Sequence, residues 1–455
     1  MPAGTALAYT YAYPRESAML GDGRNRRLYL ATDGARAVPS APPVFFRGTL
    51  VAPKRTADQL VSVSDVVASR FHTPSAMLGK ILLLADPVIT CGIDRLRFEG
   101  FSSCCGAYAR LDLLAPALEG EFLGAGTSNV NFNAPMRAAL GQVRDGDAVA
   151  LTLGADRFEM SRDAHTVVER KVDLPLRWLR GFCEVQAYQA RMRPVMELDG
   201  AALRRFLRDL PAQWKGGAWV SPSPGGIRLS ERSGSVRVGG VTRLRALRLP
   251  AEHALSARVY AADDEGASAW EIATPDSRFV LVLSPDAWRG FSGEGQTLGT
   301  LANGAAGNAL AVTRAALRWQ PAIDAEQIAA SAALPVDDVL AALAELAASG
   351  LVGYDLAEGA YFKRELPFEP DASRKRQPRL RAAEDLLAGE CVAIEPNGDA
   401  TVAWVSSGGV EYRVALEGDA ARCTCPWYAK HRATRGPCKH VLAARLFLAR
   451  AGERV

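Results

Sequence analysis

The apolar and polar positions of the first 310 residues alternate mainly with the period of two that is typical of half-buried β-strands. Residues 44–52, 147–154 and 156–161 show this alternation, and similar runs between 214 and 310 are separated by Gly, Ser, Pro and Asp. Residues 199–209 instead have apolar positions at helical spacing, with Asp199 available as the cap. The patterns predict a mixed α/β N-terminal domain over 1–210 and a β-rich region over 211–310, and they leave open that the two are continuous.

A helical period replaces the alternation at about residue 311. Three helical segments come first and a hairpin pattern centred on Glu358-Gly359 follows, with Gly350 as the stop of the third helix. Helices and a hairpin in this order resemble a winged-helix domain, which we predict over 311–367. The Pro-containing basic stretch 368–382 predicts a linker, and residues 383–455 remain as a C-terminal domain. The predicted fold class is therefore multi-domain α+β.

The charge of the winged-helix-like segment argues against DNA binding. Between Asp324 and Gly350 there are five acidic residues and no Lys or Arg, and only the wing carries Lys363 and Arg364. A recognition helix must approach phosphates, for which the affinity comes from cations. We expect this segment to contact protein or to pack against another domain.

The overall composition fits a globular protein. Of the 455 residues, 48% are hydrophobic and 23% charged, and the net charge of +4 is too small to predict nucleic-acid binding by itself. No apolar run approaches the ~18 residues of a membrane span, and the first residues lack a signal-peptide pattern. We expect a cytoplasmic protein with no membrane anchor.

Three of the eight cysteines and two of the five histidines lie in the stretch CTCPWYAKHRATRGPCKH, residues 423–440. Without secretion the thiols stay reduced, and a disulfide between Cys423 and Cys425 would be strained. A redox pair would normally have C-x-x-C spacing. Metal binding is the interpretation that remains.

The spacing gives a ligand set for that metal. Residues two apart on a strand face the same side, so we expect Cys423 and Cys425 together at the end of a β-hairpin. Cys438 and His440 then open a helical segment, and three thiolates with one imidazole are a usual set for structural zinc. His431 is an alternative to His440, although its polar loop favours exposure.

The order C-x-C, twelve residues, C-x-H on a β-hairpin followed by a helix resembles the SWIM zinc finger, over roughly residues 390–452. Segments 97–113, 174–189 and 283–299 also look like parts of long bacterial SWIM-containing proteins. Proteins of that kind are associated with MoxR-type AAA+ ATPases and von Willebrand A-domain proteins. The resemblance therefore implies zinc as cofactor and these proteins as partners, without supplying a mechanism.

The predicted finger is basic. From Ala421 to Gly452 there are seven Lys or Arg and no acid, which makes DNA or RNA a possible partner. The candidate contacts, with two aromatic residues able to stack on bases, are Trp427, Tyr428, Lys430, Arg432, Arg435, Lys439, Arg374, Lys375 and Arg376. The alternative is a solvated basic face with Trp427 packed over the zinc site.

No motif favours an enzyme. Cys104-Cys105 could serve as a nucleophile with His165 or His72 as base, but two small residues beside Gly106 fit a buried strand better. Residues 293–299, GEGQTLG, match neither common phosphate-loop pattern and predict a tight turn. We expect a zinc-binding SWIM-domain protein that binds nucleic acid or protein. The alternative is an adaptor or assembly subunit of a MoxR-type ATPase and von Willebrand A-domain system, without direct nucleic-acid binding.

Overall fold

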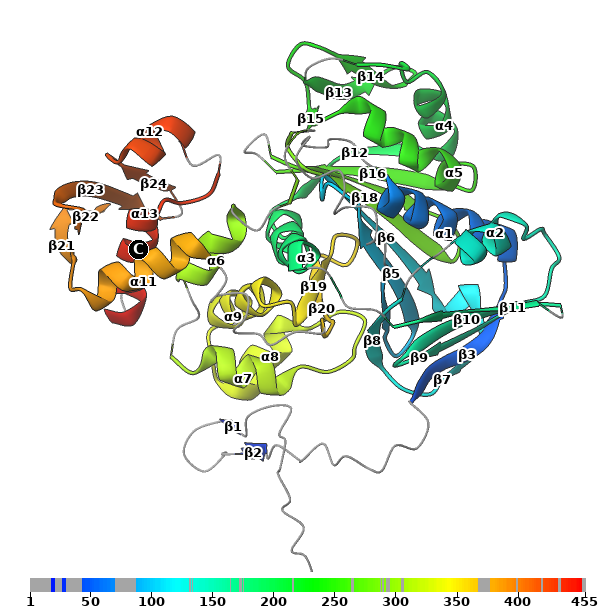
Figure 1. The fold of residues 1–455 in the computed structure, drawn as a ribbon, viewed down its shortest axis with the longest axis horizontal. Coiled ribbons are helices and arrows are strands. Elements are labelled where there is room, and N and C mark those ends of the chain that lie inside the picture. The colour runs from blue at the N-terminus through cyan, green and yellow to red at the C-terminus, as the bar shows by residue number, and fades with distance from the viewer. Residues whose placement is uncertain are drawn as a thin grey trace, which may run out of the picture.

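The computed structural model describes residues 43–451 with gaps, together with two short paired strands, β1 (Ala18–Leu20) and β2 (Arg27–Tyr29) (Figure 1). The gaps are 70–86, 131, 133, 164, 172–173, 175, 215–216, 263–265, 287, 289, 292–294, 304–306, 367–376, 398–399, 419 and 433–434. His72, Arg374, Lys375, Arg376 and most of the predicted linker lie outside the described residues.

An antiparallel sheet of eight strands forms the centre of the large N-terminal unit. In spatial order the strands are β12 (Arg193–Asp199), β16 (Ser256–Ala261), β17 (Ser268–Ala273), β18 (Ser277–Leu283), β6 (Ala107–Leu114), β5 (Arg95–Phe101), β4 (Val88–Cys91) and β8 (Gly126–Asn129). Regions 1–210 and 211–310 both contribute strands to this sheet, so they share one layer and one hydrophobic core.

A second antiparallel sheet of five strands packs beside the first through the same core. Its order is β11 (His165–Arg170), β10 (Arg157–Arg162), β9 (Val149–Gly154), β3 (Val44–Leu50) and β7 (Leu118–Phe122), and the short 3-10 helix η3 (Ala115–Ala117) leads into β7. Strands β9 and β10 form a hairpin, as the alternation of 147–154 and 156–161 predicts. Helix α1 (Pro53–Ala68) packs on β5 and β6, and α2 (Ala134–Gly141) packs on α1.

Residues 200–252 form a lobe at one end of the large sheet, which we call the basic lobe (Figure 1). Its elements are α4 (Gly200–Arg208), β13 (Ala218–Ser223), β14 (Gly226–Ser230), β15 (Val236–Val238), η4 (Val241–Leu247) and α5 (Arg248–Ala251). Asp199 caps α4 as predicted, because its Oδ1 accepts a hydrogen bond from the Ala202 amide at 2.7 Å.

The helical segment has its elements in the predicted order: α7 (Ala309–Ala316), α8 (Ala325–Ala332), α9 (Val336–Ala348), β19 (Val352–Asp355) and β20 (Ala360–Lys363). Gly350 follows α9 with φ +79°, the left-handed conformation that ends a helix. The similarity to winged-helix domains stays a prediction. Helix α3 (Leu176–Gln189) packs against α9 and β19, and α6 (Gln296–Asn303) packs against α3 and α9. Residues 296–299 begin α6, so the predicted tight turn is wrong there.

The hairpin β19–β20 is held on the large sheet by buried ion pairs. Asp355 accepts hydrogen bonds from Arg97 at 2.9 Å and from Arg110 at 3.0 Å. Burial alone would raise the pKa of Asp355, but the charges of the two arginines hold it well below its usual range. Arg364 is fully buried and donates to Glu99 at 2.6 Å. This wing cation is therefore already paired inside the protein.

The C-terminal domain is a four-stranded antiparallel meander with three helices. Its elements are α11 (Pro378–Ala388), β21 (Val392–Asn397), β22 (Ala400–Ser407), β23 (Val410–Glu417), β24 (Ala420–Cys423), α12 (Pro426–His431) and α13 (Lys439–Ala451). Gly408 and Gly409, with φ of +61° and +77°, form the two-residue turn between β22 and β23. Helix α13 packs on α11 and α6, which joins this domain to the rest of the molecule (Figure 1).

Two expectations for this domain need correction. Helix α11 begins at Pro378, so residues 378–382 belong to the domain and not to the linker predicted over 368–382. Pro378 occupies the first turn, where its missing N–H costs nothing. The two strand-like runs expected before the cysteines, 401–405 and 410–416, form the hairpin β22–β23, and the expected helix is α13. Strands β21 and β24 and helices α11 and α12 enlarge the domain beyond that prediction.

Among the described residues no single helix is long and apolar enough to cross a membrane. One pair, α8 with α9, passes by length and composition but is bent by 119°.

Candidate metal centre and its basic surface

The first two cysteines of the predicted ligand set lie at a strand end and a helix start. Cys423 is the last residue of β24, and Cys425 is the N-cap of α12. The Cys425 Sγ accepts a hydrogen bond from the Tyr428 amide at 3.4 Å. Our expectation that both cysteines lie on one strand was therefore wrong for Cys425, although the two thiols do converge.

The other two residues of the set begin α13. Cys438 precedes the helix and its carbonyl accepts the Leu442 amide at 3.0 Å, while His440 lies in the first turn. The His440 ring stacks on Tyr412 of β23, with ring centroids 4.4 Å apart and planes inclined by 22°. Tyr412 therefore fixes the orientation of the imidazole toward the cysteines.

These four residues are all buried, and their ligand atoms lie within 4.8 Å of one another. The Cys423 Sγ and the His440 Nδ1 are 3.8 Å apart. Tetrahedral zinc with bonds of ~2.3 Å to sulfur and ~2.0–2.1 Å to nitrogen spaces its ligands by about 3.6–3.8 Å. Cys423, Cys425, Cys438 and His440 are thus positioned to bind zinc.

The protonation of the free thiols also fits a metal site. A hydrogen bond from Cys423 lowers the pKa of the Cys438 thiol, and the same interaction raises the pKa of Cys423. Burial raises the pKa of Cys425. A bound divalent ion compensates the negative charge of several thiolates that cannot otherwise coexist in so small a buried volume.

The comparison with protein families agrees with this geometry. Residues 412–446 match the family model described as SWIM zinc finger. These residues form a SWIM zinc finger. The matched segment runs from within β23 through β24 and α12 into α13 and so contains all four ligands.

Comparison of the whole chain adds little beyond the SWIM finger. No curated protein matches the sequence. Similar solved structures include the proliferating cellular nuclear antigen of Entamoeba histolytica, with a TM-score of 0.36, and the PCNA2–PCNA3 complex of Sulfolobus tokodaii, with a TM-score of 0.39. Each has 9% identity and covers 53% of this chain and 99% of its own. Both TM-scores are below 0.5.

The alternative ligand His431 lies outside the group of ligand atoms in the SWIM finger. It ends α12, is half-buried, and its ring centroid lies 4.8 Å from that of Trp427. His431 therefore packs on the aromatic part of α12 and not on the thiols.

We predict that His440→Ala lowers the zinc content well below one per chain, whereas His431→Ala leaves it at one. The His440 imidazole faces the Cys423 thiol, and three thiolates alone leave a tetrahedral site open. Metal analysis of the two purified variants tests this. Loss of zinc from His431→Ala with retention in His440→Ala would move the fourth ligand to His431.

The two aromatic candidates for base stacking are engaged inside the SWIM finger. The Arg379 guanidinium of α11 lies 4.7 Å from the centroid of the Trp427 ring, and His431 packs on the same side chain. The Tyr428 hydroxyl donates to the Ala421 carbonyl at 2.6 Å. Arg379 also donates to the Arg435 and Pro437 carbonyls, at 2.8 and 2.9 Å. Arg379 thus connects α11 to α12 and to the residues that precede Cys438. The sequence analysis did not predict this role.

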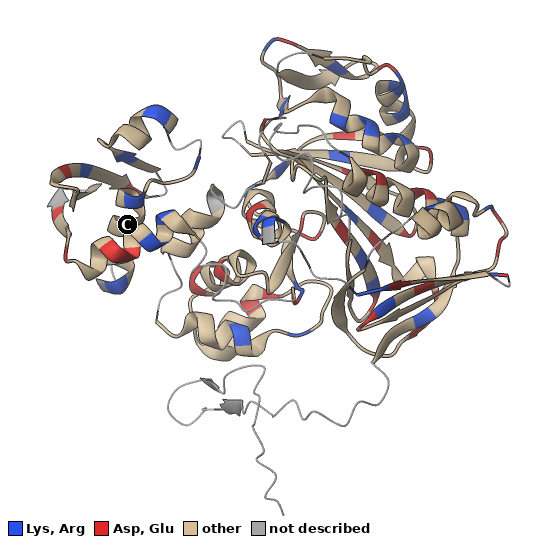
Figure 2. Cartoon of the chain, in the orientation of Figure 1, with Lys and Arg blue, Asp and Glu red and all other residues tan. Residues whose placement is uncertain are grey.

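The predicted cations of the SWIM finger differ in exposure. Lys430 on α12 and Arg432, the C-cap that follows it, are exposed, whereas Arg435 and Lys439 are half-buried. Arg422 on β24 is also exposed. Exposed positive charge therefore lies at α12 and on β24, the two elements that carry Cys425 and Cys423 (Figure 2).

The candidate nucleophiles Cys104 and Cys105 lie in the turn between β5 and β6, outside the group of zinc ligands. Cys105 is buried between β5 and β6, and burial raises the pKa of its thiol to about 12. His165 is exposed on β11 of the other sheet. That the protein is not an enzyme stays a prediction.

Proposed function

We propose that this chain is a zinc-stabilised binding protein whose SWIM finger contacts the phosphates of nucleic acid. The observation that carries the proposal is the charge of residues 420–451, which include no acid and expose Arg422, Lys430 and Arg432 around the zinc site. Affinity for phosphate comes from cations and needs no particular base sequence. Zinc would fix α12 and β24 relative to each other and so fix the spacing of these cations.

We expect this binding to depend on phosphate contacts more than on base stacking. Trp427 is covered by Arg379 and His431, and Tyr428 is tied to Ala421. Stacking on a base would require these contacts to break first. A strong preference for single strands is therefore not expected, although the aromatic residues are suitable in type.

A different surface favours the second candidate, an adaptor that binds protein. Helix α9 exposes Val336 and Leu340, at 39% and 42%, beside the exposed Asp337. Exposed apolar residues beside an acid fit a protein partner, and the negative charge of the acid would repel phosphate. Association with a MoxR-type AAA+ ATPase and a von Willebrand A-domain protein belongs to this candidate. A cytoplasmic location stays a prediction for both candidates.

The test of the SWIM finger is the salt dependence of nucleic-acid binding by the full zinc-loaded chain. If three or four cations touch phosphate, log affinity should fall with log salt with a slope of about −3 on duplex DNA. Lys430→Glu should reduce that slope by about 1 or more. Arg450→Glu, an exposed cation near the far end of α13, is the matched control and should change it much less.

Absence of measurable affinity for duplex or single-stranded oligonucleotides at low salt would refute nucleic-acid binding by the SWIM finger. Binding that is equally sensitive to Lys430→Glu and Arg450→Glu would show that net charge alone is responsible. In either case the adaptor function would become the better interpretation.

A further inference from the structure

The basic lobe carries a concentration of positive charge that the sequence predictions did not use. Residues 200–252 include ten Lys or Arg and three Asp or Glu, whereas the whole chain has a net charge of only +4. Figure 2 shows cations on α4 and α5 of this lobe, apart from the C-terminal domain. The excess of positive charge in the basic lobe is therefore separate from that of the SWIM finger.

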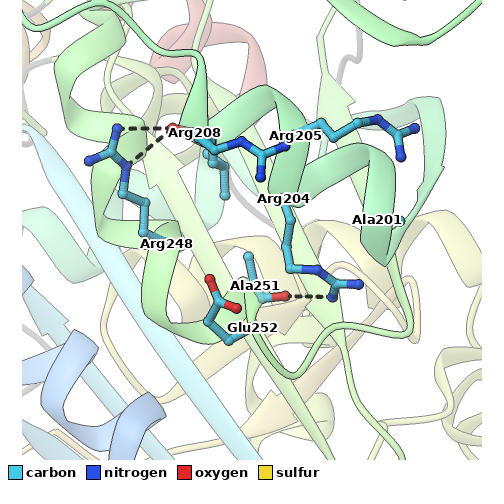
Figure 3. A pocket seen from close by; sticks show the side chains of 8 residues that line it. Ala201, Arg204, Arg205, Arg208, Arg248, Ala251 and Glu252 are labelled. Carbon is cyan, nitrogen blue, oxygen red and sulfur yellow. Dashed lines mark hydrogen bonds between the residues drawn. The ribbon is translucent and has the colours of Figure 1, made fainter.

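A hollow of about 720 Å³ lies between α4 and α5 (Figure 3). Arginine dominates its lining, which includes Arg204, Arg205, Arg208 and Arg248 with Glu252 as the acid. Arg205, Arg208 and Arg248 are exposed, and Arg204 is half-buried. The guanidinium groups are therefore accessible to a ligand from solvent.

Two of these arginines are already oriented by the backbone. Arg248 donates from Nε and Nη2 to the Leu207 carbonyl at 3.1 and 3.0 Å, and Arg204 donates from Nη1 to the Ala251 carbonyl at 3.1 Å (Figure 3). A guanidinium has five N–H groups, so each keeps donors for a ligand. Fixed arginines lose less conformational entropy on binding and match the geometry of phosphate oxygens.

The positive surface continues beyond this first hollow. A second hollow, of about 460 Å³, is lined by residues of α4 and of strands β13 and β14 and includes Arg228 and the acid Asp209. Arg205 lines both hollows and donates to the Gly225 carbonyl at 3.4 Å. We call the five arginines of the two hollows the arginine track: Arg204, Arg205, Arg208, Arg228 and Arg248.

We propose that the arginine track binds the phosphate backbone of a nucleic-acid strand. A small phosphate compound would occupy one hollow, whereas the cations extend over two adjoining hollows that share Arg205. A strand with phosphates at regular spacing can contact both. Such contacts position a strand without reading its bases, so the binding is independent of sequence. The arginine track shares no residue with the SWIM finger, so this proposal does not depend on nucleic-acid binding by the finger.

The test compares two charge-reversal variants of the full zinc-loaded chain. Arg205→Glu/Arg208→Glu changes two exposed residues of the track. Within the described residues it removes the 3.4 Å hydrogen bond from Arg205 to the Gly225 carbonyl and the 4.0 Å contact of Arg208 with exposed Asp209. Arg144→Glu/Arg170→Glu makes the same charge change at two exposed positions outside the lobe. Affinity for labelled duplex and single-stranded oligonucleotides is measured over a salt series, with thermal unfolding as the check that both variants fold.

The affinity of the track variant should be lower by a factor of about ten or more, and the magnitude of its log–log salt slope should be smaller by about 2. The affinity of the control variant should change by less than about twofold. Glu252→Gln, which removes the acid of the first hollow, should strengthen binding. Equal losses in both double variants, or no loss in either, would overturn the proposal. Displacement of the oligonucleotide by ATP at equal phosphate concentration would overturn it too, because the site would then hold a small phosphate compound.

The outcome also separates the track from the SWIM finger. A loss in Arg205→Glu/Arg208→Glu without a loss in Lys430→Glu supports the track and contradicts nucleic-acid binding by the SWIM finger. The opposite result contradicts the track.

Discussion

Cys438→Ser should remove the zinc and unfold residues 378–451 while the eight-stranded sheet stays folded. A metal held by Cys423 and Cys438 would join β24 to the start of α13, whose Val441 and Leu442 are buried in the core of the C-terminal domain. Structural zinc contributes about 10–16 kcal/mol in small fingers, which is as large as the entire stability of a typical domain. Hydrogen exchange on the full chain should show lost protection in β22, β23 and α13, with protection retained in β5 and β6.

Cys391→Ser is the matched control for this change. Cys391 is half-buried in the same domain and donates to the Gly389 carbonyl at 3.3 Å, but it lies outside the ligand group. This variant should keep about one zinc per chain and the exchange pattern of the parent. Full zinc content in Cys438→Ser would rule out Cys438 as a ligand.

The zinc ligands could be predicted from the sequence because they are local. All four lie within eighteen residues, and their spacing fixes which atoms can meet. The one detail that failed is the position of Cys425. Pro426 begins α12 immediately after Cys425, so the strand ends at Cys423 and Cys425 becomes a helix cap.

Helix α11 was missed because its N-terminal half has the composition of a linker. Arg379 and Arg381 follow a Pro-containing basic stretch. Leu380 and Ala383 are the fully buried residues of the face that packs into the domain, and Leu386 and Leu387 are only partly buried against the same core. Two fully buried positions in a helix of 11 residues, which is about three turns, give a weak helical period. The helix is therefore stabilised mainly by tertiary packing, in particular against α13.

The buried ion pairs could not be predicted from local pattern. On β5, Arg95, Arg97 and Glu99 alternate with apolar residues, which is typical of a strand with one face in water. In the structure this face is covered by the hairpin β19–β20, more than 250 residues later in the chain. The arginine track was missed for another reason: the net charge of the whole chain conceals it, and a charge count over 200–252 would have found it.

Asp355→Ala should be the most damaging single change to the contact between the helical segment and the large sheet. It leaves Arg97 and Arg110 buried without the carboxylate that both contact. Asp112 also lies 3.1 Å from Arg110, but burial raises the pKa of Asp112 and weakens it as a counter-charge. Removal of one partner from a buried ion pair costs about 3–5 kcal/mol. Denaturant unfolding should show this loss, and hydrogen exchange should show β19 and β20 opening first.

Glu358→Ala tests the alternative that any acid in this hairpin has the same effect. Glu358 is 32% exposed in its side chain and pairs with Arg278 at 2.8 Å. A pair with this much solvent access contributes about 1 kcal/mol or less, so the change in unfolding free energy should be small. Equal losses in the two variants would show that burial of the Asp355 pair is not what matters.

The pH dependence of unfolding gives a second measurement of the same pair. The pKa of Asp355 is lower in the folded protein than its unfolded value of about 3.9. The stability that Asp355 contributes is therefore present above about pH 4 and is lost as the pH falls through the folded-state pKa. Between pH 5 and pH 2 the parent protein should lose more stability than Asp355→Ala does. Parallel acid-unfolding curves for the two proteins would mean that Asp355 is not the charged partner of Arg97 and Arg110.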